Sequence, residues 1–229
     1  MLNRHTVLCA LLVCLACRGE PVSNKNDAVV LLHGMGRTRA SMFLLARGLE
    51  SHGYRVLNFP YGEREKTIDE ISDELRSYVE REVGTGRYHL IGHSLGNIII
   101  RNSFREDHPG KLGHVVMLAP PNHPAKLAKM LADNPLYRWR TGDSGQKLGS
   151  AEFYSKLPVP NVPFGVIAGN KGQQLTFDEP NDGVVTVANT KLDGMADWIA
   201  LPKMHTFIMN GDDTLNHVVS FLKRGQFKR

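Results

Sequence analysis

A serine flanked by glycines two residues away on either side stands in the segment Gly92-His93-Ser94-Leu95-Gly96. An apolar run at 88–91 precedes it and three isoleucines at 98–100 follow it, which predicts a strand before the serine and a helix after it. On so sharp a turn the serine takes a strained backbone conformation that lifts its hydroxyl above the sheet, and the glycines avoid side-chain clashes. The helix also points its positive end toward negative charge that forms during attack. The pattern predicts that Ser94 is a nucleophile.

A serine hydroxyl is a poor nucleophile until a neighbouring imidazole accepts its proton. A carboxylate must in turn fix the tautomer of that imidazole and stabilise its cation. The chain therefore has to bring a histidine and an acid to Ser94 from elsewhere in the sequence.

The elements that would position such residues follow an alternating order. From Ala28 onward, short apolar runs alternate with longer stretches of helical period, which is typical of a parallel sheet flanked by helices. The predicted strands are Ala28–Leu32, Tyr54–Asn58, Tyr88–Ile91, His114–Leu118, Phe164–Ala168 and Trp198–Leu201. Apolar residues at helical spacing predict one helix over 68–83 and a last helix over 215–222. The fold class is therefore α/β.

With its predicted strand and helix, the segment around Ser94 resembles the nucleophile turn of the α/β-hydrolase family, specifically small bacterial lipases and esterases. The resemblance extends over nearly all of the chain after residue 27. It implies a mostly parallel central sheet with helices on both faces. It also implies the chain order serine, acid, histidine, with the acid and the histidine on loops after later strands.

The acid and the base are assigned from this resemblance. Lipase-like members carry an Asp-Gly-Val-Val run at the acid, and that run begins here at Asp182. His205 follows the last predicted strand, where the family has its histidine. The implied catalytic residues are thus Ser94, Asp182 and His205, and this chemistry requires neither a metal ion nor an organic cofactor. The alternatives are Asp178, Glu179, Asp193 and Asp197 for the acid and His217 for the base.

An oxyanion-binding loop is implied by His33-Gly34-Met35-Gly36, which directly follows the first predicted strand. Lipases and esterases of this resemblance carry a His-Gly pair here. In the family, the backbone N–H groups of the residue after that pair and of the residue after the nucleophile bind the oxyanion, which implies Met35 and Leu95. We interpret His33 as a structural hydrogen-bonding residue and His93 as a family feature of the turn.

Residues 120–163 interrupt the alternation with many prolines, glycines and aromatic residues. This composition predicts a short, irregular, cap-like insertion above the strand ends. Leu136, Tyr137 and Trp139 are candidates for the apolar lining of a substrate pocket, and the alternative is that they only pack the insertion onto the domain. The run Gly142-Asp143-Ser144-Gly145 is predicted to form a turn.

The first 17 residues have the composition of an export signal, because Arg4 and His5 precede an apolar run that is too short to span a bilayer as a helix. The run ends in Cys14-Leu15-Ala16-Cys17, which resembles the lipid-attachment box of bacterial lipoproteins, although Cys14 stands where that family usually has leucine. Two outcomes stay open. Cys17 is lipidated and residues 18–27 tether the domain 28–229 to a membrane, or the signal is cleaved in the ordinary way. The protein is expected to be periplasmic, anchored as a lipoprotein, or secreted.

Composition disfavours several other classes of protein and of site. All three cysteines lie in the first 17 residues, so residues 28–229 contain no disulfide framework and no cysteine metal site. The net charge of +5 comes from scattered basic residues, which disfavours nucleic-acid binding. The 41% apolar and 22% charged residues are those of a globular protein.

These inferences predict a serine hydrolase that cleaves carboxylic esters, either small molecules or lipids, through an acyl-enzyme. An acyltransferase and an amidase or thioesterase with the same triad remain alternatives. So does a non-catalytic, envelope-associated binding protein that has kept the fold.

Overall fold

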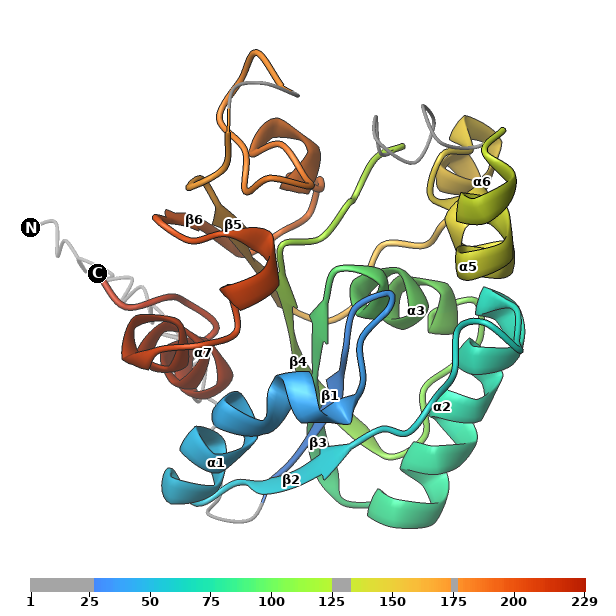
Figure 1. Ribbon diagram of the computed structural model, residues 1–229. Coiled ribbons are helices and arrows are strands. Elements are labelled where there is room, and N and C mark those ends of the chain that lie inside the picture. The colour runs from blue at the N-terminus through green and yellow to red at the C-terminus, as the bar shows by residue number, and fades with distance from the viewer. Residues whose placement is uncertain (1–26, 125–132, 174–176) are drawn as a thin grey trace, which may run out of the picture.

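The computed structural model describes residues 27–124, 133–173 and 177–229, without the side chains of 135–140 (Figure 1). Its centre is a six-stranded sheet with the strand order β2-β1-β3-β4-β5-β6, in which every pairing is parallel. The strands are β1 Ala28–Leu32, β2 Arg55–Asn58, β3 Arg87–His93, β4 Lys111–Leu118, β5 Phe164–Gly169 and β6 Asp197–Leu201. All six predicted strands are present, β1 with the predicted ends and the other five with shifted ends, and the predicted α/β class with a parallel sheet is confirmed.

Helices cover both faces of this sheet (Figure 1). The α-helices are α1 Phe43–Ser51, α2 Ile68–Val83, α3 Leu95–Ser103, α5 Pro135–Lys147, α6 Ala151–Lys156 and α7 Asp212–Arg224. Short 3-10 helices are η1 Arg39–Met42, η2 Ala188–Thr190 and η3 His205–Phe207. Helices α1 and α7 contribute to the hydrophobic core on one face, and α2 and α3 contribute to the core on the other.

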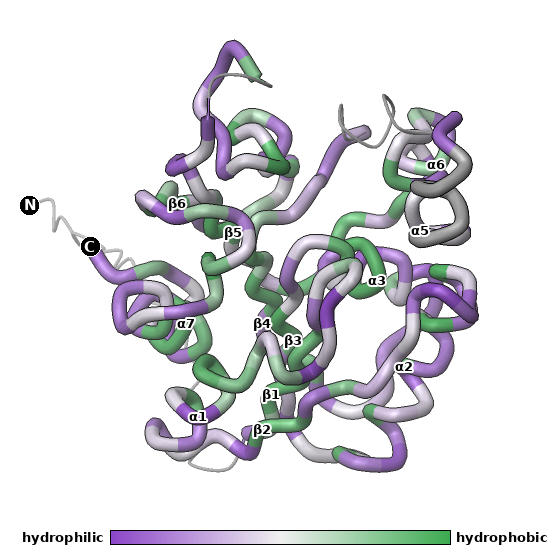
Figure 2. The backbone as a smooth tube through the Cα atoms, viewed as in Figure 1, coloured by the Kyte–Doolittle hydropathy of each residue, from purple (hydrophilic) through white to green (hydrophobic). Residues whose placement is uncertain are grey.

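The central strands β1, β3, β4 and β5 are largely apolar because both of their faces are buried over most of their length. In β1, Val30 and Leu32 join the core beneath α2 and α3, whereas Val29 and Leu31 join the core beneath α1 and α7. The hydrophobic residues of the strands therefore form a continuous band through the middle of the molecule (Figure 2). This explains why the sequence shows unbroken apolar runs instead of strict alternation.

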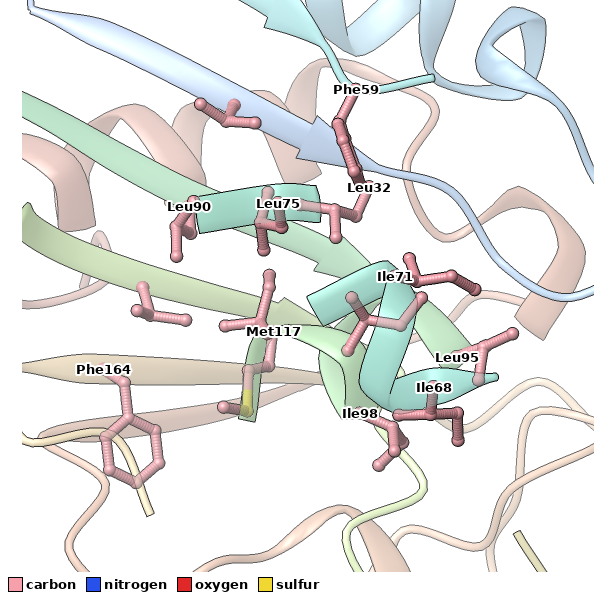
Figure 3. Packing of buried hydrophobic residues seen from close by; sticks show 14 of the residues in the cluster. Leu32, Phe59, Ile68, Ile71, Leu75, Leu90, Leu95, Ile98, Met117 and Phe164 are labelled. Atoms are coloured by element: carbon pink, nitrogen blue, oxygen red, sulfur yellow. The ribbon is translucent and has the colours of Figure 1, made fainter. Parts of the chain in front are cut away.

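Helix α2 has clear start and stop signals. Thr67 and Glu70 form a capping box, in which each side chain bonds the backbone N–H of the other residue, and Gly84 ends the helix with φ 63°. One face carries Ile68, Ile71, Leu75 and Val79, all fully buried. Figure 3 shows three of them packed against Leu90, Ile98 and Met117, so α2 is fixed against β3, β4 and α3.

The insertion between β4 and β5 is more regular than its composition predicts, because it contains α5 and α6. The turn predicted at Gly142–Gly145 is wrong. The segment lies within α5, which is kinked at Gly142 (φ 55°), and the Ser144 carbonyl accepts a helical bond from Leu148. The Asp143 carboxylate accepts the orphan N–H of Ile68 at the start of α2, so this part of α5 is held against α2.

Among the residues that the structure describes, no helix is both long enough and apolar enough to cross a membrane. The predicted signal, Cys17 and residues 18–26 of the predicted tether lie outside the described residues. Asp27, the last residue of that tether, is buried and its carbonyl oxygen accepts the N–H of Arg55, so it belongs to the domain.

Candidate active site

Ser94 occupies the sharp turn between β3 and α3. Its backbone angles, φ 52° and ψ −118°, are strained for a residue with a side chain. A Cβ on Gly92 would stand 2.4 Å from Asn97 Oδ1, and a Cβ on Gly96 would stand 2.7 Å from the Leu32 carbonyl oxygen. Both glycines are therefore required for the turn to close against β1 and α3.

A chain of hydrogen bonds joins the three residues predicted as nucleophile, base and acid. Ser94 Oγ lies 2.9 Å from His205 Nε2, and His205 Nδ1 lies 2.8 Å from Asp182 Oδ2. His205 is 8% exposed and Asp182 is 1% exposed. Because the Asp182 carboxylate accepts a hydrogen bond from Nδ1–H, Nε2 is left unprotonated and can accept the proton of the Ser94 hydroxyl.

The Asp-Gly-Val-Val run explains how Asp182 is held. Its Oδ1 accepts the backbone N–H groups of Val184 and Val185, at 2.9 and 2.7 Å, which leaves Oδ2 for His205. The Asp182 carbonyl oxygen also accepts the N–H of His205, at 2.9 Å. Gly183, with φ 99°, permits the tight turn that these bonds need. The run thus fixes both the carboxylate and the backbone of its partner histidine.

His93 is buried between the nucleophile turn and the loop of His205. Its Nε2 lies 3.0 Å from the His205 carbonyl oxygen. Burial, followed by the proximity of His205, lowers the pKa of His93 well below its usual value, so the ring stays neutral. It therefore supports the backbone of His205 and is not positioned as a second base.

The loop His33–Gly36 lies directly against the nucleophile, since a Cβ on Gly34 would stand 3.2 Å from Ser94 Cβ. The Gly34 carbonyl oxygen accepts from Arg37 N at 3.2 Å and from His33 Nδ1 at 2.9 Å. In a trans peptide the N–H points away from the C=O, so these two bonds fix the direction of the Met35 N–H. His33 thereby acts as a hydrogen-bonding residue of the loop.

The amides of Met35 and Leu95 have no hydrogen-bond partner within the described parts of the chain. Leu95 N opens α3 immediately after the nucleophile, where a helix carries its partial positive charge. Two free backbone donors beside a serine hydroxyl form an arrangement that can stabilise an oxyanion.

The alternative acid and base residues have other surroundings. Asp197 accepts the N–H groups of Trp198 and Phe227 and pairs with Arg229. Asp178, Glu179 and Asp193 are exposed. His217 is half-buried on α7 with its ring edge-on to Phe227.

The candidate pocket residues Leu136, Tyr137 and Trp139 lie on α5, but their side chains are outside the described part of the structure. A cavity of about 450 Å³ opens beside Asp182 and His205, lined by Lys171, Gln173, Val184, Met204 and Thr206 among others. No group of three histidine, cysteine, aspartate or glutamate side chains within the described ranges is arranged to hold a metal ion.

Tyr61 and Glu63 also contact the loop 33–36, and no sequence pattern singled them out. The Tyr61 hydroxyl donates to the His33 carbonyl oxygen, and the Glu63 carboxylate accepts the N–H of Gly36. The strand order is the signal that could have found these two residues, because the loop after β2 lies next to the loop after β1 when these strands are parallel neighbours.

Comparison with known proteins agrees with this fold. The sequence pattern of the Alpha/beta hydrolase family matches residues 29–227. No curated protein matches the chain at a significant level.

Three solved structures with similar folds show how far the likeness extends. The mature lipase BlEst2 of Bacillus licheniformis superposes with a TM-score of 0.72 at 19% identity, covering 90% of this chain and 96% of that one. The metagenomic carboxyl esterase MGS0156 gives 0.63 at 16% identity over 80% and 66% of the two chains. The RedJ thioesterase of Streptomyces coelicolor gives 0.60 at 14% identity over 95% and 97%. At such identities the likeness establishes the fold alone.

Proposed function

Because this chain belongs to the alpha/beta hydrolase family, we propose that it is a serine hydrolase that cleaves carboxylic esters through an acyl-enzyme. The observation that carries the proposal is the chain of hydrogen bonds from Asp182 through His205 to Ser94. An activated serine, an orienting carboxylate and two free amides are the groups that acyl transfer requires.

The first half of the reaction forms the acyl-enzyme. Ser94 Oγ attacks the carbonyl carbon while its proton passes to His205 Nε2, and Asp182 stabilises the resulting imidazolium. The carbonyl oxygen becomes an oxyanion, which the Met35 and Leu95 N–H groups bind. Each such donor typically contributes about 3 kcal/mol of transition-state stabilisation. The imidazolium then protonates the leaving alcohol oxygen and the ester C–O bond breaks.

The second half releases the acid. His205, neutral again, removes a proton from a water molecule that attacks the acyl carbonyl. The tetrahedral intermediate collapses, the proton returns to Ser94 Oγ, and the carboxylic acid leaves.

Fluorophosphonate labelling followed by peptide mapping tests the proposal, because the probe reacts only with an activated serine. We expect the label on the peptide that contains Ser94. We also expect Ser94→Ala to abolish both labelling and hydrolysis of short p-nitrophenyl esters. Ser144→Ala is the matched control, since that serine is fully buried in α5 and far along the chain from the nucleophile turn. Hydrolysis by Ser94→Ala at the wild-type rate would refute the assignment.

The type of ester that is cleaved is a further part of the proposal and concerns the same site around Ser94. We propose a small-molecule or lipid ester as the substrate. Rates on soluble and micellar esters compare an esterase with a lipase. Alcohol acceptors test for an acyltransferase, and thioesters and amides test the remaining alternatives. If Ser94 is not labelled and no acyl substrate is turned over, the non-catalytic binding protein is favoured.

The location of the protein is a separate proposal that rests on the sequence alone. We propose export to the periplasm or cell exterior, with Cys17 as the lipid-attachment residue if the protein is anchored. Metabolic labelling with a fatty-acid analogue in wild type and Cys17→Ala cells tests the anchor.

A further inference from the structure

The oxyanion loop donates a hydrogen bond to a buried carboxylate that the proposed reaction does not use. Gly36 N donates to Glu63 Oε1 at 2.6 Å, and Glu63 is only 6% exposed. A hydrogen bond to an ionised acceptor is shorter and stronger than one between neutral groups. A carboxylate is also costly to bury unless it is paired, so its position next to a catalytic loop needs a physical explanation.

From this contact we propose that Glu63 is a positioning residue, which holds the loop 33–36 so that the Met35 amide stays directed at the reacting carbonyl oxygen. The inference rests on the proposed function, because it assigns Glu63 a role in the same oxyanion site.

The loop is held on both sides of Met35 by a single segment of the chain. On one side, the Tyr61 hydroxyl donates to the His33 carbonyl oxygen, and the Tyr61 ring stacks on the His33 ring with centroids 4.1 Å apart and 1° between the planes. On the other side, Glu63 binds Gly36 N. Burial, and after it the charge of Glu63, raise the pKa of Tyr61 well above its usual value, so its hydroxyl remains a donor. Segment 61–63 therefore binds both ends of the loop from His33 to Gly36.

Packing does not fix the Gly36 end of the loop. Gly36 is exposed with φ 66°, and a Cβ placed on it would meet nothing within 4 Å. The opposite holds at Gly34, where a Cβ would stand 2.7 Å from His93 Nδ1. The hydrogen bond to Glu63 therefore restrains the loop on its open side, together with the turn bond from Arg37 N to the Gly34 carbonyl oxygen.

Glu63 is itself held by the insertion. A Cβ on Gly142, at the kink of α5, would stand 3.7 Å from the Glu63 carbonyl oxygen and 3.5 Å from that of Arg64. The next residue, Asp143, bonds Ile68 N and pairs with Lys147. The kinked helix thus lies against the backbone at 63–64, which couples the position of the insertion to the oxyanion loop.

The test compares an oxygen ester with its thionoester, in which sulfur replaces the carbonyl oxygen and is a poor acceptor for oxyanion-hole amides. If Glu63 positions those amides, E63A lowers kcat/KM for the oxygen ester by about 10-fold, mainly through kcat, because a misdirected donor forfeits part of its transition-state contribution. The thionoester rate changes by less than about twofold, because it draws little on the same donors. The ratio of the two rates therefore falls.

Two variants provide the controls. E63Q keeps a carbonyl oxygen at the same place, so it retains most of the oxygen-ester rate. Glu65→Ala removes an exposed carboxylate two residues away and leaves both rates unchanged. As a readout independent of activity, the Gly36 amide proton resonance moves upfield in E63A and stays near its wild-type position in E63Q, because hydrogen bonding to an acceptor shifts amide protons downfield.

Each result either supports or overturns the positioning role of Glu63. Equal falls for the oxygen ester and the thionoester in E63A show a general structural role and overturn the proposal, as do unchanged rates. If E63A fails to fold, E63D takes its place, because a side chain shorter by one methylene loses the bond to Gly36 while keeping the charge. If the wild type hydrolyses neither ester and Ser94 is not labelled, the proposed function fails as well. A labelled, active wild type with an unchanged ratio in the variants refutes only the role of Glu63.

Discussion

His93 Nε2 lies 3.0 Å from the carbonyl oxygen of His205, so the residue before Ser94 holds the backbone of the histidine whose ring contacts Ser94. The nucleophile turn and the loop after β6 are thus joined twice, once through the imidazole of His205 and once through its carbonyl group. Because His93 is fully enclosed, this second bond is shielded from competing water.

We expect His93→Ala to lower kcat by about 10-fold with little change in KM, since a shift of His205 by a fraction of an ångström weakens proton transfer in the transition state. Steady-state kinetics on a soluble ester measure this. His52→Ala, at the exposed end of α1, is the control. A wild-type kcat for folded His93→Ala would show that the bond does not position the base.

The strained backbone of Ser94 predicts a stability difference between two inactive variants. Glycine adopts φ 52° without steric cost, whereas alanine does not, so Ser94→Gly is expected to unfold with a free energy about 1 kcal/mol higher than Ser94→Ala. Urea denaturation of both proteins provides the comparison. If the alanine variant were equally stable, the turn would not store strain at this residue.

Removal of the negative charge in Asp182→Asn is expected to reduce kcat on the order of 10⁴-fold, because an amide side chain no longer selects the tautomer that leaves His205 Nε2 free. The matched variant is Asp197→Asn. Asp197 is also a buried carboxylate that accepts backbone N–H groups, but it serves the C-terminal segment. Its loss is expected to lower stability and to leave the kcat of the folded protein unchanged. Equal kcat losses in the two variants would contradict the assignment of the acid.

Acid should destabilise the fold through histidines whose pKa is lowered by burial, among them His89, which is buried, and His108, which is half-buried. Burial, and then nearby His114 and Arg87, lower the pKa of His89 to about 3, and burial and then Arg76 lower the pKa of His108 to about 4. A histidine in the unfolded chain has a pKa of about 6.5. Below that pH the unfolded chain binds protons that the folded protein does not, so the free energy of unfolding falls as the pH falls.

Each of these histidines contributes up to about 1.4 kcal/mol per pH unit to this slope between about pH 6.5 and its folded pKa. Urea titrations at about pH 7, 6 and 5 measure the slope. In His89→Asn the side-chain oxygen still accepts the backbone N–H of His114, which His89 Nδ1 accepts at 3.0 Å in the wild type. The variant should lose the part of the slope that His89 contributes. A slope identical to that of the wild type would indicate that His89 is protonated in the fold.

The sheet was predictable because parallel strands covered on both faces read as short apolar runs. Val29 and Val30 point to opposite cores, and both must be hydrophobic. Ser94, Asp182 and His205 follow strand ends, and all strand ends of a parallel sheet lie at one edge, so their proximity follows from chain order.

The residues that support the site could not be read in the same way. Glu63 has no periodic context, and its role appears only when β2 is placed beside β1. Gly142 and Ser144 suggested a turn because local propensity favours one. The contact of Asp143 with the first turn of α2 comes from a residue 75 positions away. Interactions between distant segments leave little trace in a single sequence.

The way the chain enters and leaves the sheet has a practical consequence. Asp27 precedes β1, and Arg229 pairs with Asp197 at the beginning of β6, so both described ends lie where the parallel strands start, while Ser94 follows the end of β3. A reporter protein fused after Arg229, or a bead coupled there, would approach from the side remote from the reacting hydroxyl. Immobilised or tagged preparations are therefore expected to keep the edge of the sheet that carries Ser94 accessible to bulky esters.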